Sequence, residues 1–230
     1  MVDLVVQQSM LRRAVEQEKV DLHCINLRDF GKSNYRQIDD TPFGGGAGMV
    51  MMAEPLFQAI DHAIKLVGGS EKLRVIYPSP QGVLWSHKHA VENSEEADKV
   101  IVICGHYKGI DERVIEKYVT HEYSIGDFVV TSGELPALIL IDSVVRLIPG
   151  VLNKIESALS DTFASDLLDA PYYTQPREIE GMKVPEVLIS GHHEKIKAWR
   201  TSSSEEVTRK KRPDIWKKYL ELNDLEKNHE

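Results

Sequence analysis

The chain has 230 residues, of which 42% are hydrophobic and 28% charged, as in ordinary globular proteins with a sizeable core. No apolar run approaches the ~20 residues of a membrane span. The N-terminus lacks the basic segment and apolar core of a secretory leader, so we expect a cytoplasmic protein. A net charge of -8 argues against nonspecific coating of nucleic acid, which depends on Lys and Arg, but it leaves room for a local basic face.

The first half of the chain alternates between strand and helix patterns. The N-terminal segment MVDLVVQQSMLRRA is expected to pass from strand to helix. Short apolar runs predict strands at Val20–Leu27, Leu73–Tyr77 and Lys99–Cys104. Between them, apolar residues recur at helical spacing over Glu54–Val67 until two glycines end the pattern. This alternation predicts an α/β domain with a mostly parallel sheet.

The two cysteines, Cys24 and Cys104, both lie inside predicted strands. This position favours buried thiols over a disulfide or a metal pair.

The pattern changes after Cys104. Short apolar pieces at Val119–Ile125 and Phe128–Thr131 are joined by turns too brief for helical crossovers. Glu134–Leu147 then predicts a second strong helix, which Pro149 and the following glycine end.

The last third of the chain has a different organisation. From Val151 to about Met182 the chain is mixed and contains several prolines, which is typical of an interdomain linker. After Ser190 helical patterns return and predict a small helical C-terminal domain, with Pro213 at a helix start. The Ser-rich acidic stretch Thr201–Thr208 favours a segment that is flexible until a partner binds.

The segment Ser124–Pro136, SIGDFVVTSGELP, carries a glycine on either side of an apolar run. Gly126 and Gly133 lack a Cβ, so the segment predicts a ligand held mainly by main-chain groups. Other blocks accompany it: GGGAGMVMM, IYPSPQG, CGHYKGIDERV, LIPGVL, LLDAPYYTQP and GMKVPEVLISGHHEKIKAWR. From about Ser9 to about Pro213, these ordered blocks resemble the bacterial tRNA (guanine-N1)-methyltransferases, which are knotted SPOUT enzymes.

The resemblance implies a fold, a reaction and partners. The fold is an α/β SPOUT-type deep trefoil knot over residues 1–158, a linker over 159–182 and an all-helical tRNA-binding domain over 183–230. Because knots are very rare, only the resemblance supports this one. The implied reaction is methyl transfer from S-adenosylmethionine to N1 of the guanosine immediately 3′ of the anticodon in tRNA. The implied assembly is a homodimer, with no membrane involved.

Methyl transfer to guanine N1 needs a base for the N1 proton and a cation for charge developing on O6. By the resemblance, Asp161 is the general base and Arg146 the cation, whose planar fork suits the O6 edge. The residues alone leave other roles open. Asp161 after Ser160 also fits a helix cap, and Arg146 can pair with Asp142 one turn earlier. Asp169 is a second carboxylate nearby, with a loop or cap role equally open.

The resemblance places one set of residues around the cofactor: Tyr77, Pro78, Ser79, Gln81, Gly105, Ile125, Gly126, Asp127, Phe128, Val129, Val130 and Gly133. Ile125, Phe128 and Val130 equally fit plain core packing. The glycine-rich loop Gly44–Gly48 is not followed by GKS or GKT. It therefore lacks the lysine and the metal ligand of a triphosphate-binding loop, which argues against that function.

A second set of residues is expected at the RNA: Arg36, Gly45, Gly46, Arg200, Arg209 and Lys210. The positive excess near the C-terminus fits contact with an RNA backbone, although a solvated helix face has the same composition. Trp199 and Trp216 suit either stacking on bases or the core of the small domain. No set of Cys, His and carboxylate residues has the spacing of a zinc site, so we assign no metal ligand. Magnesium enters through the resemblance only.

The chain departs from the family pattern in three places. The FPE-containing loop that usually follows the first strand is missing, Lys108 stands where many members carry Glu, and Ser132 replaces one of two adjacent glycines. The alternatives are another SPOUT RNA methyltransferase or a catalytically impaired tRNA-binding homologue. The chain lacks the GxGxxG fingerprint of nucleotide-binding oxidoreductases, which argues against that class of enzyme.

Overall fold

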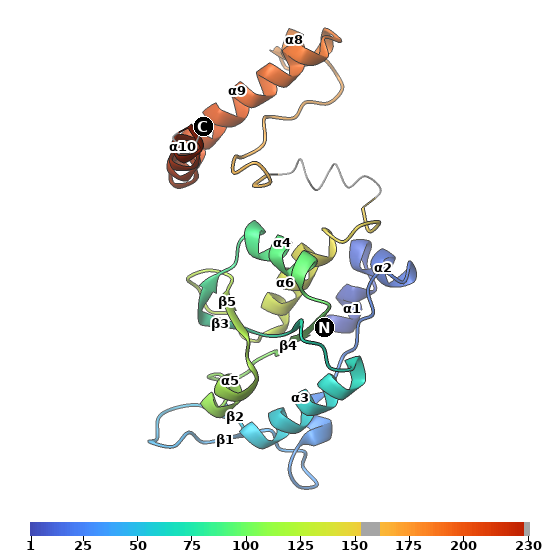
Figure 1. Ribbon diagram of the computed structural model, residues 1–230, viewed down its shortest axis with the longest axis vertical. Coiled ribbons are helices and arrows are strands. Elements are labelled where there is room, and N and C mark those ends of the chain that lie inside the picture. Colours follow the sequence, from blue (N-terminus) through green and yellow to red (C-terminus); the bar gives the residue numbers. More distant parts are fainter. Residues whose placement is uncertain (153–161, 228–230) are drawn as a thin grey trace. The chain divides into compact units, whose positions relative to one another are not determined.

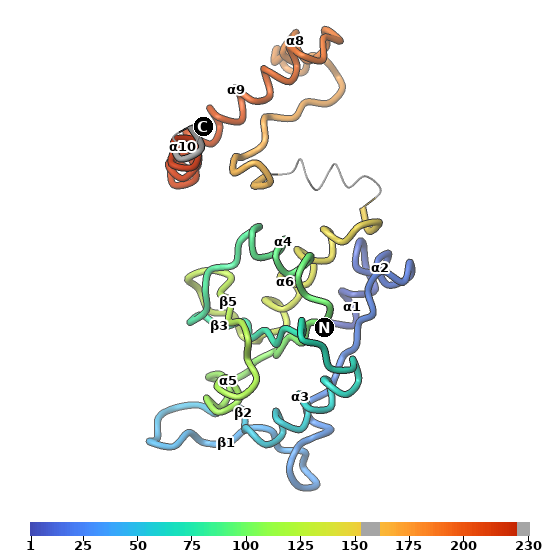
Figure 2. The backbone as a smooth tube through the Cα atoms, viewed as in Figure 1, coloured from blue at the N-terminus to red at the C-terminus, as the bar shows by residue number. Residues whose placement is uncertain are grey.

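The computed structural model describes residues 1–152 and 162–227, in two compact units that comprise Met1–Ile155 and Glu156–Glu230. Figure 1 labels their helices and strands, and Figure 2 follows the backbone by residue number. None of the described helices combines the length and the apolar character needed to cross a bilayer.

The first unit is built on a three-stranded parallel sheet. Its central strand is β3 (Leu73–Leu84), with β4 (Lys99–Val102) on one side and β5 (His121–Ser124) on the other. The predicted strands at Leu73–Tyr77 and Lys99–Cys104 are therefore confirmed. The protein is an α/β protein with a parallel sheet, as its alternating pattern indicated.

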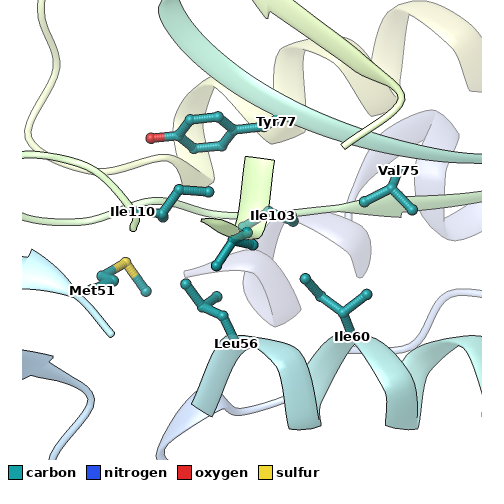
Figure 3. Packing of buried hydrophobic residues seen from close by; sticks show 8 residues of the cluster. Met51, Leu56, Ile60, Val75, Tyr77, Ile103 and Ile110 are labelled. Atoms are coloured by element: carbon teal, nitrogen blue, oxygen red, sulfur yellow. The ribbon is translucent and has the colours of Figure 1, made fainter. Parts of the chain in front are cut away.

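Alternate residues of β3 face opposite sides of the sheet, and both sides are apolar. Val75 and Tyr77 belong to a core that includes Met51, Leu56, Ile60, Ile103, Ile110 and Val114, most of which Figure 3 labels. Ile76, between them, packs on the other side with Tyr123 and Leu140. This burial on both faces explains why the strand reads as a continuous apolar run.

Helices cover both faces (Figure 1). On the side of Val75 lie α3 (Ala53–Val67), which Gly68 ends in a left-handed conformation with φ 68°, and α5 (Glu112–Tyr118). On the other side lie α4 (His87–Glu96) and α6 (Glu134–Val145). The helices predicted at Glu54–Val67 and Glu134–Leu147 are confirmed to within two residues at their ends.

Strand β3 continues beyond its predicted end through an irregularity between Pro78 and Val83, where its register against β5 shifts. Gly82 lies so close to β5 that an added Cβ would be 2.4 Å from the Tyr123 nitrogen. Glycine is therefore required for the bulged part of the strand to stay in the sheet.

In the N-terminal region, two of the predicted strands are wrong. Met1–Val6 holds a short helix, α1 (Val2–Val6), followed by α2 (Ser9–Glu16), rather than a strand and a helix. Val20–Leu27 contains no strand and ends in the 3-10 turn η1 (Leu27–Phe30). Strand propensity mostly reports the packing and pairing of a residue with its neighbours, and this run pairs with no described strand.

One further prediction in this unit is wrong. Cys24 is exposed rather than buried, while Cys104 is half-buried, and both cysteines are free thiols as expected. The apolar piece Phe128–Thr131 forms a loop. The exposure of Cys24 follows from the absence of a strand at Val20–Leu27. A two-stranded antiparallel ladder of β1 (Asp39–Asp40) and β2 (Val50–Met51) brackets the glycine-rich loop.

The second unit contains a two-stranded hairpin of β6 (Glu178–Ile179) and β7 (Met182–Lys183), then three helices. These are α8 (Glu186–Ile189), α9 (His193–Lys211) and α10 (Pro213–Lys227), so Pro213 does begin a helix.

The expected flexible segment Thr201–Thr208 is helical instead. Its last residue is fully buried, because the Thr208 hydroxyl accepts a hydrogen bond from Leu168 N and donates one to Ser204 O. One buried tertiary contact thus outweighs the weak helix preference of its serines.

Two neighbouring residues of α6 test this packing. Leu140 is 2% exposed and Ile139 is 49% exposed. Truncation of Leu140 therefore removes contacts in the core, whereas truncation of Ile139 removes a largely solvent-exposed side chain. We expect Leu140→Ala to lower the free energy of unfolding by roughly 2–5 kcal/mol through lost contacts and a cavity. Ile139→Ala should change it by about 0.5 kcal/mol or less. Urea titrations measure both, and equal losses would contradict the described orientation of α6.

Candidate functional site

Three segments of the first unit meet beyond the carboxyl ends of the parallel strands. They are residues 104–109 after β4, residues 125–133 after β5, and the part of β3 around Tyr77, just before its bulge. The Gly133 amide donates a hydrogen bond to the Gly105 carbonyl at 2.7 Å, which joins the first two loops. Open parallel sheets bind their ligands in this position.

Glycine makes this junction possible. An added Cβ on Gly133 would lie 2.5 Å from the Gly105 nitrogen, and one on Gly105 would lie 3.0 Å from the Tyr77 ring. The two loops and the tyrosine therefore stack without room for another side chain. Burial raises the pKa of Tyr77, with a further contribution from Glu122, so its phenol stays neutral.

The loop from Ile125 to Val130 has a turn that glycine again permits. Gly126 has φ 140°, and an added Cβ would lie 2.7 Å from the Phe128 ring. The Ser124 hydroxyl closes the turn by accepting from Gly126 N and donating to Gly126 O, each at 3.2 Å. These hydrogen bonds between the Ser124 side chain and the main chain fix the conformation of the turn.

This turn directs apolar side chains outward. Phe128 is 56% exposed and Val129 85%, so core packing does not account for Phe128. Ile125 does pack on the second core, as the alternative interpretation proposed. Exposed apolar side chains beside main-chain amides suit a ligand with an aromatic ring and polar edges.

The other predicted cofactor residues differ in exposure. Pro78 and Ser79 are buried, and the Ser79 hydroxyl accepts a hydrogen bond from the amide of exposed Gln81 at 3.1 Å. Asp127 is exposed and Val130 half-buried in the loop after β5. All twelve predicted residues lie in the three segments that meet, or next to them.

Sequence reasoning missed a polar pair beside these loops. His106 Nε2 lies 2.7 Å from Glu134 Oε1 at the start of α6. Burial would raise the pKa of Glu134, but hydrogen bonds from Ser132 and His106 outweigh it and leave that pKa lowered. The signal available in the sequence was an acidic residue in the first turn of a helix that follows a glycine.

Cys104 lies close to this pair. Burial, together with the nearby Glu134, raises the pKa of its thiol to about 12. A thiol with that pKa stays protonated at neutral pH and is a poor nucleophile.

The structure describes only one of the two predicted catalytic residues. Arg146 is half-buried at the end of α6, and its amide donates to the Asp142 carbonyl at 3.2 Å. Asp161 lies outside the described residues. Asp169 is half-buried in the second unit, where its amide lies 3.4 Å from the Thr162 hydroxyl.

The glycine-rich loop presents main chain to solvent. Gly44, Gly45 and Gly46 have φ of 84°, 80° and 110°, and no atom lies within 4 Å of a Cβ added to any of them. At Gly48 an added Cβ would lie 3.1 Å from the Lys108 side chain, which therefore covers one end of the loop. Arg36, the predicted RNA residue before it, forms an exposed 3.0 Å ion pair with Asp29.

The remaining predicted RNA residues, Arg200, Arg209 and Lys210, are exposed along α9. The last turn of this helix holds three basic residues, which complement the negative end of its dipole. Trp199 is half-buried with its ring centroid 6.4 Å from that of Tyr173, so it belongs partly to the packing of the second unit.

No group of three or more His, Cys, Asp or Glu side chains within residues 1–152 and 162–227 is arranged to hold a metal ion.

Comparison with known proteins identifies relatives of this chain. The family model for tRNA (Guanine-1)-methyltransferase TrmD matches residues 1–218. A relative from Clostridioides difficile is 48% identical over 213 residues, which cover 93% of this chain and 91% of the relative. One from Brevibacillus brevis is 48% identical over 223 residues, covering 97% and 90%.

A third relative, from Burkholderia ambifaria, is 49% identical over 205 residues, covering 88% of this chain and 77% of its own length. All three relatives carry the name tRNA (guanine-N(1)-)-methyltransferase. Because the family model spans nearly the whole sequence and the relatives share almost half of their residues with it, the chain belongs to the tRNA (guanine-1)-methyltransferase family.

Proposed function

We propose that the chain transfers a methyl group from S-adenosylmethionine to N1 of the guanosine immediately 3′ of the anticodon in tRNA. The observation that carries this proposal is the bond between Gly133 and Gly105, which brings the two glycine-bounded loops together beyond the strand ends. Family membership supplies the reaction, and the loops supply a site of suitable chemistry.

The residues present fit the cofactor. The main chain between Gly126 and Gly133 can offer donors and acceptors, and exposed Phe128 and Val129 offer an apolar surface beside it. When bound, S-adenosylmethionine supplies an electrophilic methyl group. Buried, neutral Tyr77 supports the loops from behind and adds no charge to the site.

The protein must also handle a proton and a charge on guanine. In the proposal, Asp161 accepts the N1 proton, which makes that nitrogen a nucleophile. Arg146 donates to O6, where negative charge develops as the proton leaves, and its guanidinium stays charged at every working pH. Proton transfer by such a side chain is typically worth about 10²–10⁴-fold in rate.

The rest of the proposed organisation follows the family. Residues 1–158 form the knotted cofactor domain, 159–182 the linker, and 183–230 the helical tRNA-binding domain. Two copies of the chain form a cytoplasmic homodimer, and magnesium accompanies the tRNA. The exposed basic residues of α9 and the open glycine loop support RNA contact from both units.

Lys108 favours a second candidate, a tRNA-binding homologue with impaired catalysis. Its side chain packs over Gly48 and places a cation where many family members have a carboxylate. Cofactor binding without methyl transfer would favour this candidate. Methylation at another nucleotide would favour a different SPOUT RNA methyltransferase.

The base assignment predicts the behaviour of Asp161→Asn. The amide keeps the shape of the side chain but cannot take the N1 proton, so we expect methyl transfer to fall by about 10²-fold or more. Cofactor affinity should stay within about twofold. Transfer from labelled S-adenosylmethionine to unmodified tRNA, mapped by nuclease digestion and mass spectrometry, measures the first effect. Asp169→Asn is the control, and full activity of Asp161→Asn would refute the assignment.

The loop junction predicts that Gly133→Ala weakens cofactor binding. A methyl group 2.5 Å from the Gly105 nitrogen must push the two loops apart. We expect at least about a tenfold loss of S-adenosylmethionine affinity by calorimetry, equivalent to ~1.4 kcal/mol. Gly69→Ala is the matched control, since nothing lies within 4 Å of its added Cβ. Equal affinity of the two variants would place the cofactor elsewhere.

The RNA assignment predicts the salt dependence of tRNA binding. Removing both Arg209 and Lys210 by alanine substitution should weaken binding and reduce the slope of log K against log salt. The slope should fall by ~0.7–0.9 for each lost phosphate contact. Lys88→Ala, at an 82% exposed side chain on α4, should leave the slope unchanged. An unaltered slope in the double variant would remove α9 from the RNA interface.

A further inference from the structure

A short turn of the second unit, Thr162–Asp169, has a strained main chain that its own hydrogen bonds close. Phe163 N donates to Leu167 O at 2.9 Å. The amide of Asp169 donates to the Thr162 hydroxyl at 3.4 Å, which joins the two ends of the turn. Phe163 has φ 74°, in the left-handed region that favours glycine. A strained backbone of this kind persists only where surrounding contacts determine it.

A contact that determines this turn comes from α9. Thr208 is 0% exposed, and its hydroxyl accepts a hydrogen bond from Leu168 N at 2.9 Å while it donates one to Ser204 O at 2.7 Å. Of the residues of α9, all of which the structure describes, Thr208 alone is buried. Figure 1 shows the turn beside the end of this helix. A hydroxyl on a regular helix thus sets where the turn lies, although 40 positions separate Thr208 from Leu168.

The two sides of this hydrogen bond lead to residues of the proposed reaction. Arg209 and Lys210 follow Thr208 directly in the chain, are exposed on α9 and are proposed RNA contacts. Thr162, the first residue of the turn, follows the proposed base Asp161 in the chain. One buried hydroxyl therefore connects the helix proposed to contact RNA with the turn that comes directly after the base.

We propose that Thr208 is a positioning residue, whose hydroxyl holds the turn Thr162–Asp169 on α9 so that bound tRNA and the turn keep one fixed arrangement. This inference rests on the proposed function, because a fixed arrangement matters where a side chain must reach the N1 proton. A misplacement of about 1 Å at a reacting group can cost about 10²-fold in rate. In this role Thr208 touches neither the cofactor nor guanine, and it takes no proton.

A positioning role differs from that of an ordinary buried polar group in what its loss changes. A hydroxyl that only satisfies Leu168 N contributes to stability and leaves the rate of the folded enzyme unchanged. A hydroxyl that positions the turn sets kcat, whereas RNA affinity comes from the exposed basic residues and cofactor affinity from the loops of the first unit. Its loss should therefore lower kcat and spare the KM values of both substrates.

Substitutions on one helix separate these roles. Thr208→Val keeps the shape of the side chain and removes the hydroxyl, whereas Thr208→Ser keeps the hydroxyl. Thr201→Val is the matched control, because the Thr201 hydroxyl donates to Lys197 O at 3.2 Å on the same helix but at an exposed position. Thr208→Ala removes the hydroxyl without placing a methyl group against Leu168 N, and it replaces Thr208→Val where circular dichroism shows that variant to be unfolded.

Hydrogen exchange at the Leu168 amide tests the anchor without an assay of activity. We expect Thr208→Val to accelerate this exchange at least about tenfold relative to the wild type, Thr208→Ser and Thr201→Val. Equal exchange rates in all four proteins would overturn the proposal.

Methyl transfer from S-adenosylmethionine to unmodified tRNA, measured on the folded full chain, tests the effect on rate. We expect kcat of Thr208→Val to fall at least about tenfold, with both KM values within about twofold of the wild type. Thr208→Ser should restore kcat, and Thr201→Val should not alter it. A raised KM for tRNA with unchanged kcat would overturn the proposal in favour of an RNA contact.

Failure of this inference is distinguishable from failure of the proposed function. An active wild type with unaltered kcat in Thr208→Val would overturn the positioning role alone and leave Thr208 a structural residue. An inactive wild type would overturn the proposed function, and the positioning role with it, whatever the exchange at Leu168 shows.

Discussion

The candidate site depends on the direct approach of one main chain to another. Gly133 donates to Gly105 at 2.7 Å, and Gly105 in turn lies against the ring of Tyr77. Any side chain at either glycine would separate these layers. The loops that follow two different strands are consequently joined by a main-chain hydrogen bond, with the His106–Glu134 pair beside it.

The sheet beneath this junction determines where the loops emerge. Because β3, β4 and β5 run parallel, the loops that follow β4 and β5 leave at the same edge. One apolar core on each face of the sheet packs the strands between α3 and α6. Polar groups such as His106 and Glu134 then occupy positions that the sheet has already set.

Sequence reasoning succeeded where a local pattern and tertiary packing agree. The sequence of the helix over Glu54–Val67 has an apolar stripe and a glycine after its end. In the structure the stripe is buried and the helix ends at that glycine. The same reasoning failed at Val20–Leu27 and at the N-terminus. Residues there have strand propensity, but no described strand lies beside them to pair with their main chain. It failed at Thr201–Thr208 for the opposite reason, since a buried threonine hydroxyl holds a weak helix former in place.

The sequence by itself determined the class of the protein, the strands of its parallel sheet and the glycines of its loops, because these follow from composition, periodicity and ordered motifs. Only the tertiary structure showed that Gly133 meets Gly105 and that His106 meets Glu134. The physical reason is separation along the chain. Groups nearly thirty residues apart interact only after the strands between them pair, and no local pattern encodes that distance.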